Sequence, residues 1–261
     1  MAVSPGKLVK WEADGTDNTM RSVEVKSAFQ ERLDALPWAE LRQSLCTSGY
    51  AVTPALLTAQ ECASLRELYP RDELFRSKVV MERLRFGRGD YKYFANPLPE
   101  IVREVRTRAY PHLAQIANEW AEALGEKSSF PLEHSAFLER CHRAGQKRPT
   151  PLLLHYEQEG YNCLHQDIYG AVAFPLQMVF LLGQQGRDWQ GGEFVLVEQR
   201  PRAQSKAEVI SADEGCAVIF TTRYRPVQGS RGYYRVNIKH GVARVRSGRR
   251  YTLGIIFHDA E

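Results

Sequence analysis

The sequence predicts an α+β protein in which an N-terminal helical layer packs on a C-terminal jelly roll. Residues 21–150 space their apolar side chains mostly at the helical period, whereas residues 151–261 form short apolar or alternating runs separated by Gly, Pro and Asp. Many short strands without intervening helices are typical of a sandwich or a jelly roll. A chain of 261 residues can form one elaborated domain, so we expect the helices and the β core to be integrated.

The composition excludes several classes of protein. With 43% hydrophobic residues, the chain can form a packed core. It has no run of 18 apolar residues, and residues 1–5 lack the basic and apolar segments of a signal peptide, so we expect a cytoplasmic protein without membrane contact. The five cysteines are scattered and never in C-x-x-C spacing, which argues against a disulfide framework and a zinc ribbon.

The first elements of the chain are predicted from helix start and stop signals. Residues 1–20 are polar without periodicity, and we expect a flexible tail. Residues 23–48 indicate helices broken at Pro37, with Gly49 as the stop and a short strand over 50–52.

Two further helices are expected before the β core. Thr58 and Glu61 form a capping-box pattern, so a helix should begin there. The pattern over 100–124 predicts a longer helix that Pro111 must kink or split. Residues 145–150 are expected to be a linker to the β core.

Residues 76–96 mix basic and aromatic side chains. This combination suits a nucleic acid, since cations meet phosphates while rings stack on bases. The alternative is an edge hairpin that packs its aromatic side chains on the core. The residues in question are Arg83, Arg85, Arg88, Lys92, Phe86, Tyr91, Tyr93 and Phe94.

The strands of the β core follow from alternation and turn residues. They are expected at Leu152 to Tyr156, Gln177 to Leu182, Glu193 to Glu198, Glu208 to Ile210, Ala217 to Phe220, Arg235 to Lys239, Ala243 to Arg246 and Tyr251 to Phe257.

The stretch Leu164-His165-Gln166-Asp167 contains the candidate metal ligands. In an extended strand, residues i and i+2 face the same side, so His165 and Asp167 can present an imidazole and a carboxylate to one point. With one more histidine they would form a 2-His-1-carboxylate triad for Fe(II), and His240 is the candidate. The spacing is weak by itself, because His155-Tyr156-Glu157 matches it too, and both residues can be ordinary polar groups at a strand end.

A basic run occupies the end of the chain. Residues 223–250 contain nine Lys or Arg and no Asp or Glu, which favours an anionic partner near this segment. The alternative is a charged, solvated hairpin.

Several motifs occur in the order of a known family. Tyr156 lies nine residues before His165-Gln166-Asp167, with a glycine at 160. Further blocks are Trp189-Gln190-Gly191-Gly192-Glu193-Phe194, Glu214-Gly215-Cys216-Ala217-Val218-Ile219-Phe220, His240-Gly241-Val242 and Gly248-Arg249-Arg250-Tyr251-Thr252. The region 152–257 therefore resembles the double-stranded β-helix of the 2-oxoglutarate/Fe(II)-dependent dioxygenases, and more narrowly AlkB-like bacterial oxygenases that act on alkylated nucleic acid.

This resemblance implies cofactors and residues. Fe(II) would be held by His165, Asp167 and His240, and 2-oxoglutarate and O2 would be cosubstrates. Arg250 would bind the distal carboxylate of 2-oxoglutarate, assisted by Thr252 and Tyr156. Arg250 and Thr252 share one strand face by the period of two, and Arg249 takes the role if the register differs by one residue.

The expected function is oxidative demethylation of alkylated DNA or RNA, a repair reaction, acting on single-stranded nucleic acid. Two alternatives remain open: a hydroxylase of a protein side chain or a small molecule, and a non-catalytic nucleic-acid-binding jelly-roll module, because a fold alone does not define a function. Production of succinate from 2-oxoglutarate separates the enzymes from the module. The sequence does not indicate an oligomeric state.

Overall fold

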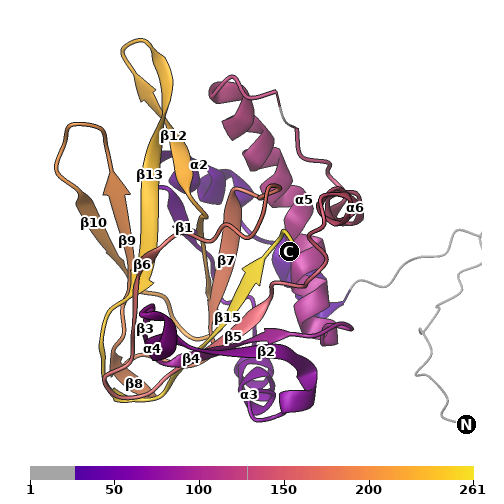
Figure 1. Ribbon diagram of the computed structural model, residues 1–261, viewed down its shortest axis with the longest axis vertical. Helices are drawn as coiled ribbons and strands as arrows, with labels where there is room; N and C mark the ends of the chain where they lie inside the picture. Colours follow the sequence, from indigo (N-terminus) through magenta and orange to yellow (C-terminus); the bar gives the residue numbers. More distant parts are fainter. Residues whose placement is uncertain (1–26, 128) are drawn as a thin grey trace, which may run out of the picture.

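Two facing antiparallel sheets form the centre of the protein, and helices cover the outer face of the larger sheet (Figure 1). The computed structural model describes residues 27–127 and 129–261, so the tail expected over 1–20 lies outside the described residues. The helices are α1 (Ala28–Asp34), α2 (Trp38–Ser48), α3 (Ala59–Glu67), α4 (Met81–Leu84), α5 (Glu100–Ala123) and α6 (His134–Arg143), with a short 3-10 helix η1 (Asp72–Leu74). The predicted α+β class, with a jelly-roll core and N-terminal helices, is confirmed.

The larger sheet has seven strands in the order β1-β11-β7-β15-β5-β4-β2, and the smaller has the order β10-β9-β13-β6-β3 with β12 paired to β13. A separate pair joins β14 to β8. The strands are β1 (Tyr50–Val52), β2 (Phe75–Val80), β3 (Gly87–Arg88), β4 (Asp90–Phe94), β5 (Leu152–Tyr156), β6 (Tyr161–His165), β7 (Leu176–Leu181), β8 (Trp189–Gly191), β9 (Phe194–Gln199), β10 (Lys206–Ile210), β11 (Ala217–Thr221), β12 (Tyr224–Gly229), β13 (Gly232–Val242), β14 (Val245–Gly248) and β15 (Arg250–Ile256).

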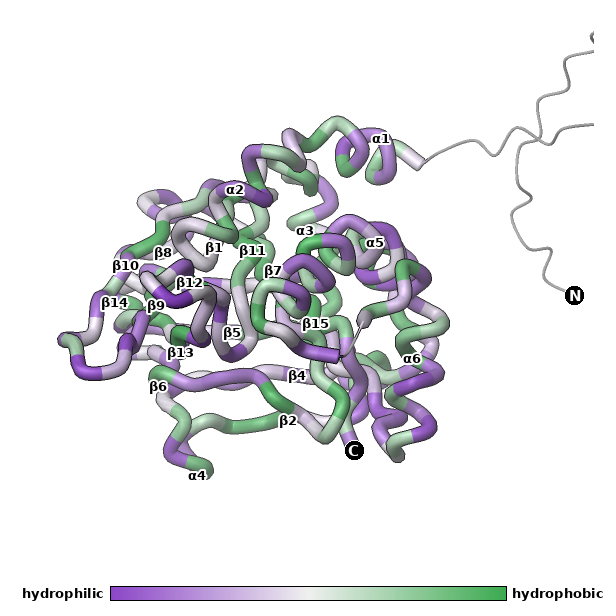
Figure 2. The backbone as a smooth tube through the Cα atoms, turned by 90° about the horizontal axis from the view of Figure 1, so that it is seen from above, coloured by the Kyte–Doolittle hydropathy of each residue, from purple (hydrophilic) through white to green (hydrophobic). Residues whose placement is uncertain are grey.

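The strand β7 separates two hydrophobic clusters because successive side chains of a strand point to opposite faces. Met178 and Phe180 pack in the cluster shared with the helices, while Val179 and Leu181 pack in the cluster between the two sheets. Seen from above, α5 and α6 lie on one side of β7 and β15, and the strands of the smaller sheet lie on the other (Figure 2). The space between the sheets is therefore the interior of the jelly roll.

The predicted helix boundaries follow the local signals. The helices break at Pro37, and Gly49 ends α2 in the left-handed conformation. The capping box of Thr58 and Glu61 is present at the start of α3. By contrast, α5 continues through Pro111 as one element, so the expected split does not occur. Proline leaves the carbonyl of Thr107 without its helical donor, and Thr107 lies on the exposed side, where water can take that place.

All eight strands predicted for the C-terminal region are present, with bounds shifted by a few residues. Three strands, β6, β8 and β12, were not among the strands predicted for the β core. For β6 the reason is that it is mostly exposed and lacks the alternation on which the prediction depended, although an extended conformation was expected at its end, around His165. The N-terminal region also contributes β1 to β4 to the two sheets, and α4 and α6 were not predicted.

The expected linker at 145–150 is instead fixed to the core. Gln146 is completely buried, and its amide donates to the carbonyls of Val172 and Asp259. Thr150 is also buried, beside the ion pair of 2.8 Å between Arg106 and Asp259. Among the residues that the structure describes, no helix has the length and apolar character to span a membrane.

Candidate active site

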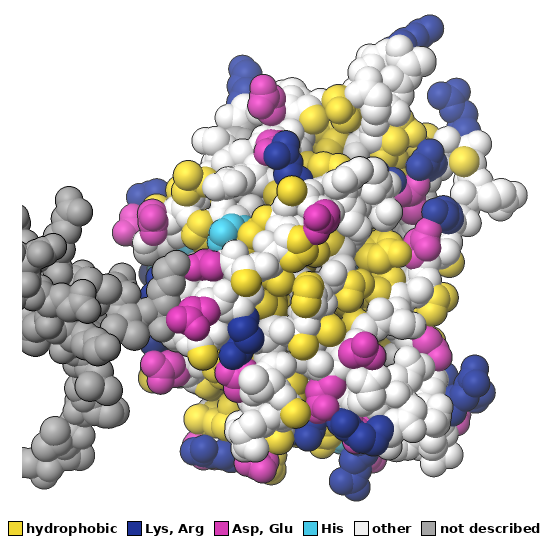
Figure 3. Space-filling model, turned by 180° about the vertical axis from the view of Figure 1, so that it is seen from behind, with side chains coloured by type: hydrophobic (Ala, Val, Ile, Leu, Met, Phe, Trp, Pro, Cys, Tyr) yellow, Lys and Arg dark blue, Asp and Glu magenta, His cyan; other side chains and the backbone are white. Residues whose placement is uncertain are grey.

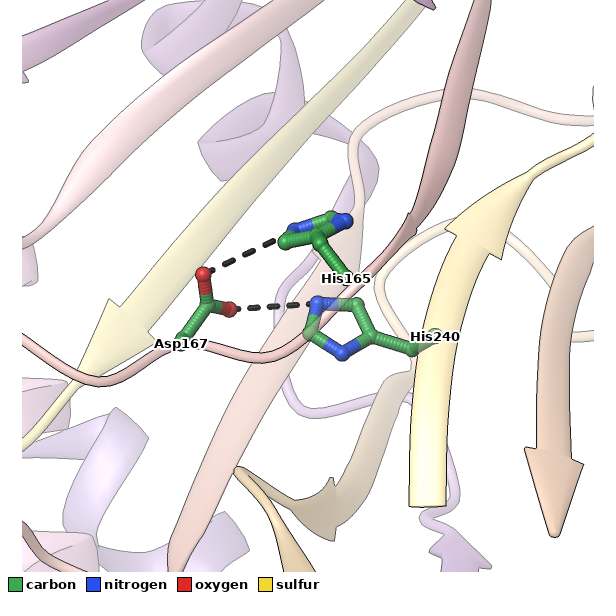
Figure 4. Close-up of side chains that lie close together, drawn as sticks. All are labelled: His165, Asp167 and His240. Atoms are coloured by element: carbon green, nitrogen blue, oxygen red, sulfur yellow. Dashed lines mark ion pairs between the residues drawn. The ribbon is translucent and has the colours of Figure 1, made fainter. Parts of the chain in front are cut away.

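The three predicted metal ligands come together between the sheets (Figure 4). His165 is the last residue of β6, and Asp167 follows in the connection to β7, so the expected strand does not extend to the carboxylate. His240 lies on β13 directly opposite His165 in the register of the antiparallel pair. Backbone pairing thus places the two imidazoles side by side, with ring centroids 4.2 Å apart.

Their ligand atoms face one another. Nε2 of His240 lies 3.1 Å from Oδ2 of Asp167, and Nε2 of His165 lies 3.6 Å from Oδ1. The potential ligand atoms of all three side chains lie within 4.8 Å of one another. Two nitrogens and one carboxylate leave other coordination positions open, which is the donor set of non-haem Fe(II) oxygenases.

Neighbouring groups orient these side chains. Nδ1 of His165 lies 2.8 Å from the carbonyl of Cys163, so this nitrogen donates and Nε2 is free to bind a metal. The hydroxyl of Tyr169 donates to Oδ1 of Asp167 at 2.6 Å. The Gln166 amide turns elsewhere and donates to the carbonyls of Arg223 and Ile238, which fixes the segment between the two ligands. Tyr169 was missed, although its spacing of two from Asp167 was a usable signal.

The electrostatics favour the protonation states that a metal requires. Burial raises the pKa of Asp167, but His240, His165 and the Tyr169 hydrogen bond outweigh burial and hold the pKa well below its usual range. Burial lowers the pKa of His240, and Asp167 opposes this effect only partly. An ionised carboxylate and a neutral imidazole are the ligand forms, and Nδ1 of His240 has no partner among the described residues. The residues present therefore fit Fe(II).

A cavity of about 400 Å³ opens beside the triad, within the range of roughly 300–1,000 Å³ typical of ligand sites. It is lined mainly by apolar and aromatic side chains, and its polar lining includes Asn162, Gln177, Arg250 and Thr252. Gln177 was not predicted to be a site residue. The signal that could have identified it is that it is the single polar residue in the apolar run Leu-Gln-Met-Val-Phe-Leu.

Arg250 is a buried cation without a counter-ion at one end of this cavity. It is 1% exposed, Nε has no hydrogen-bond partner, and no carboxylate forms an ion pair with it among the described residues. Its guanidinium lies over the rings of Tyr156 and Trp189, 5.6 and 5.9 Å from their centroids. An unpaired buried charge is costly, so the cavity fits an anionic ligand at this point.

Two of the three residues predicted to act with Arg250, or in its place, lie at the cavity, and the third does not. Thr252 and Tyr156 are buried and line the same cavity. Arg249 points outward, with its side chain 71% exposed and 3.5 Å from Glu157. The side chain of Arg249 therefore does not reach the cavity, so Arg249 does not take the place of Arg250.

The Gly191-Gly192 pair makes room for this arginine. Gly192 has φ 64°, and a Cβ there would lie 3.1 Å from Cδ of Arg250. A larger residue would be strained in this backbone conformation and would press on the guanidinium stem.

Acids from other segments pair with four of the nine cations of the basic run at 223–250. Arg225 is buried against Glu198 at 2.7 Å, and Arg235 pairs with Glu126 at 2.8 Å. Arg244 pairs with Glu159 and Arg249 with Glu157. No ion pair with the described residues forms at Arg223, Arg231, Lys239 or Arg246.

Exposed arginines also lie in a segment that borders the cavity. We call residues 81–88, which form α4 and β3, the α4–β3 lip. Arg83, Arg85 and Arg88 are exposed and form no ion pair with the described residues. Phe86 is 46% exposed, and Phe86 and Arg85 both line the cavity. The other aromatic residues of 76–96 pack inward as in the hairpin alternative, since Tyr93 and Phe94 are buried.

Known proteins match both the chain and its fold. The model of the Oxygenase-NA family, described as "Oxygenase, catalysing oxidative methylation of damaged DNA", matches residues 89–260. Two uncharacterised proteins of Mycobacterium tuberculosis, from strains CDC 1551 and H37Rv, are each 45% identical over 167 residues, which is 64% of this chain and 72% of theirs.

Solved structures share the architecture at low identity. A 2OG-Fe(II) oxygenase family oxidoreductase from Burkholderia pseudomallei has a TM-score of 0.51 and 16% identity, over 85% of this chain and 92% of that one. A prolyl 4-hydroxylase from Phytophthora capsici has a TM-score of 0.52 and 16% identity, over 88% of this chain and 65% of that one.

The fold, the 2-His-1-carboxylate donor set and the family match together fit an oxygenase that uses Fe(II) and 2-oxoglutarate. The chain belongs to the Oxygenase-NA family, whose model matches the strands from β4 to β15.

Proposed function

We propose that this oxygenase removes methyl groups from alkylated, single-stranded nucleic acid by oxidation. The observation that carries the substrate class is the α4–β3 lip, where Arg85 and exposed Phe86 line the cavity and the unpaired Arg83 and Arg88 are close to them in the chain. Arginines can hold phosphates and an aromatic ring can stack on a base, so the lip fits a strand whose target base enters the cavity. The match to a family described as acting on damaged DNA supports the same class.

Two other charged parts of the surface differ from the lip. On the face opposite to the view of Figure 1, basic and acidic side chains are interspersed (Figure 3). The tip of the β12–β13 hairpin lies at the far end of β13 from α4 and β3 (Figure 1). The lip is therefore the basic segment that adjoins the reaction site.

In this proposal His165, Asp167 and His240 bind Fe(II). Arg250 binds the distal carboxylate of 2-oxoglutarate, with Thr252 and Tyr156 beside it. When bound, Fe(II) with 2-oxoglutarate and O2 supplies the oxidant that converts a C–H bond to C–OH, while 2-oxoglutarate becomes succinate and CO2. The enclosed cavity keeps the reacting groups away from bulk water.

The product chemistry follows from the position of the methyl group. Hydroxylation of an N-methyl group gives an N-hydroxymethyl group, which breaks its C–N bond to release formaldehyde and restore N–H. The net result is loss of a methyl group, so the oxidation repairs the base. Formaldehyde and succinate should appear in equal amounts.

The experiment is a measurement of formaldehyde and succinate with single-stranded oligonucleotides that carry one N-methylated base. We expect release from methylated oligonucleotides and none from unmethylated ones. Succinate production on a peptide or a small molecule, with none stimulated by any methylated oligonucleotide, would favour the alternative hydroxylase instead.

A further inference from the structure

Gln177 on β7 carries a buried amide whose nitrogen is unsatisfied. The residue is 3% exposed and lines the cavity, and Nε2 has no hydrogen-bond partner among the described residues. An unsatisfied buried donor costs about 1–3 kcal/mol, so such a group is usually matched by a partner in the working state.

The strand register places this amide close to the triad. Gln177 lies between Phe220 on β11 and Ile256 on β15, directly opposite both. Residues that face each other in an antiparallel sheet point to the same side, here toward the space between the sheets. The ring of Phe220 lies 4.8 Å from the ring of His240. The amide therefore borders the part of the cavity where a substrate approaches the triad.

The cosubstrate does not account for this donor. Ile256 lies six residues along β15 from Arg250, which is roughly 20 Å of strand. A five-carbon dicarboxylate bound by Arg250 through one end and by the triad through the other does not extend to Gln177. The amide is therefore available to a substrate that enters the cavity.

Aromatic side chains line the cavity together with Gln177. Tyr93 and Tyr169 line the same cavity, with their rings 6.3 Å apart and nearly perpendicular. The Tyr169 hydroxyl already donates to Asp167, so it is not available as a donor to the substrate. Gln177 thus supplies a hydrogen-bond donor on a wall that is otherwise mainly aromatic and apolar.

We propose that Gln177 is a specificity-determining residue, whose amide donates a hydrogen bond to a carbonyl oxygen next to the methylated ring nitrogen of the substrate base. This inference rests on the proposed function. 3-Methylcytosine, 3-methylthymine and 1-methylguanine have such a carbonyl, whereas 1-methyladenine has an amino or imino group there. The enzyme selects the first class over 1-methyladenine, because only a base with this carbonyl gains a hydrogen bond from the donor that is unpaired in the free protein.

The test uses Gln177→Leu, which removes the amide and keeps the approximate size of the side chain. Formaldehyde release is measured on two matched oligonucleotides that carry one 3-methylcytosine or one 1-methyladenine. We expect kcat/KM for 3-methylcytosine to fall roughly 10- to 100-fold, the effect of one buried hydrogen bond, and kcat/KM for 1-methyladenine to stay within about 3-fold. The KM for 2-oxoglutarate should not change.

A stability measurement separates this role from a structural one. Replacing an unsatisfied amide by an apolar group costs no hydrogen bond, so Gln177→Leu should keep or raise the Tm. Gln146→Leu is the matched control, because that buried amide donates to Val172 and Asp259 and accepts from the Val172 amide. We expect Gln146→Leu to lower the Tm clearly.

The outcomes distinguish the assignment of Gln177 from the proposed function. If the wild-type protein releases formaldehyde and Gln177→Leu changes both substrates equally, or neither, the assignment of Gln177 is overturned and the proposed function stands. A Tm lowered by Gln177→Leu as much as by Gln146→Leu also overturns it. If the wild-type protein acts on no methylated oligonucleotide, the proposed function fails, and the assignment fails with it.

Discussion

Arg250 and Tyr156 face each other across the β15–β5 pair, with the guanidinium 5.6 Å from the centre of the phenol ring. Burial raises the pKa of Tyr156 to about 12, although Arg250 opposes the rise, so the hydroxyl stays neutral and can donate. Burial lowers the pKa of Arg250 from its ordinary value, but the guanidinium starts so high that it stays charged at neutral pH. A cation and a neutral hydroxyl together suit one carboxylate.

The first prediction concerns this pair. Arg250→Ala should raise the KM for 2-oxoglutarate roughly 10- to 150-fold, because a charge-assisted hydrogen bond contributes about 1.5–3 kcal/mol. Arg249→Ala is the matched control, since its side chain is 71% exposed, and it should leave the KM unchanged. Succinate formation at varied 2-oxoglutarate measures both. A larger effect at Arg249 would contradict the placement.

The second prediction concerns the metal. Replacing His165, Asp167 or His240 by Ala removes one of three ligands, so Fe(II) affinity should fall at least about 100-fold while the fold persists. Titration with Fe(II) under anaerobic conditions measures the affinity, and circular dichroism checks the fold. His142→Ala, with a side chain 45% exposed, is the control and should bind Fe(II) normally. Normal affinity in any triad variant would remove that residue from the site.

The third prediction concerns the α4–β3 lip. Binding of single-stranded oligonucleotides should weaken with salt by a slope of about −0.7 per phosphate contact, so replacing Arg83, Arg85 and Arg88 by Ala should reduce the slope by about 2. Fluorescence anisotropy over a range of salt concentrations gives both values.

A matched triple variant controls for total charge. Arg202, Arg231 and Arg246 are exposed arginines outside the lip, and replacing them by Ala removes the same charge. The slope of this variant should equal that of the wild type. Equal slopes for both triple variants would show that phosphates do not contact the lip.

The fourth prediction concerns pH and stability. Burial, with Arg106 nearby, lowers the pKa of His134 to about 4, while its ring stays neutral beside the Phe257 carbonyl. Because the pKa is lower in the folded state, the contribution of His134 to the free energy of unfolding is fully present above the ordinary pKa near 6.5 and is lost as the pH falls toward 4. The loss is about 3 kcal/mol, at 1.36 kcal/mol per pKa unit.

The variant His134→Gln tests whether His134 causes this loss of stability at low pH. Glutamine can still donate to the Phe257 carbonyl but does not titrate, so the variant should lose less stability between pH 7 and pH 4.5 than the wild type. Urea unfolding at both values measures the difference. An identical loss in both proteins would assign the acid sensitivity to other groups, among them His258, whose pKa burial also lowers to about 4.

Most of the elements and the three candidate ligands could be predicted from the sequence, because they depend on local patterns. Helix stops at Pro37 and Gly49 and the alternation of the late strands are set by backbone preferences that act within a few residues. The order of the motifs also led to the oxygenase family that the comparisons show.

Which charges form ion pairs depends on the tertiary structure. The run at 223–250 contains no acid, yet Glu198, Glu126, Glu159 and Glu157 reach it from other segments and pair with four of its nine cations. Likewise, β-sheet register places His240 opposite His165 and Gln177 opposite Phe220, across separations of 75 and 43 residues. Pairing between distant strands depends on how the chain folds back, and no local pattern specifies it.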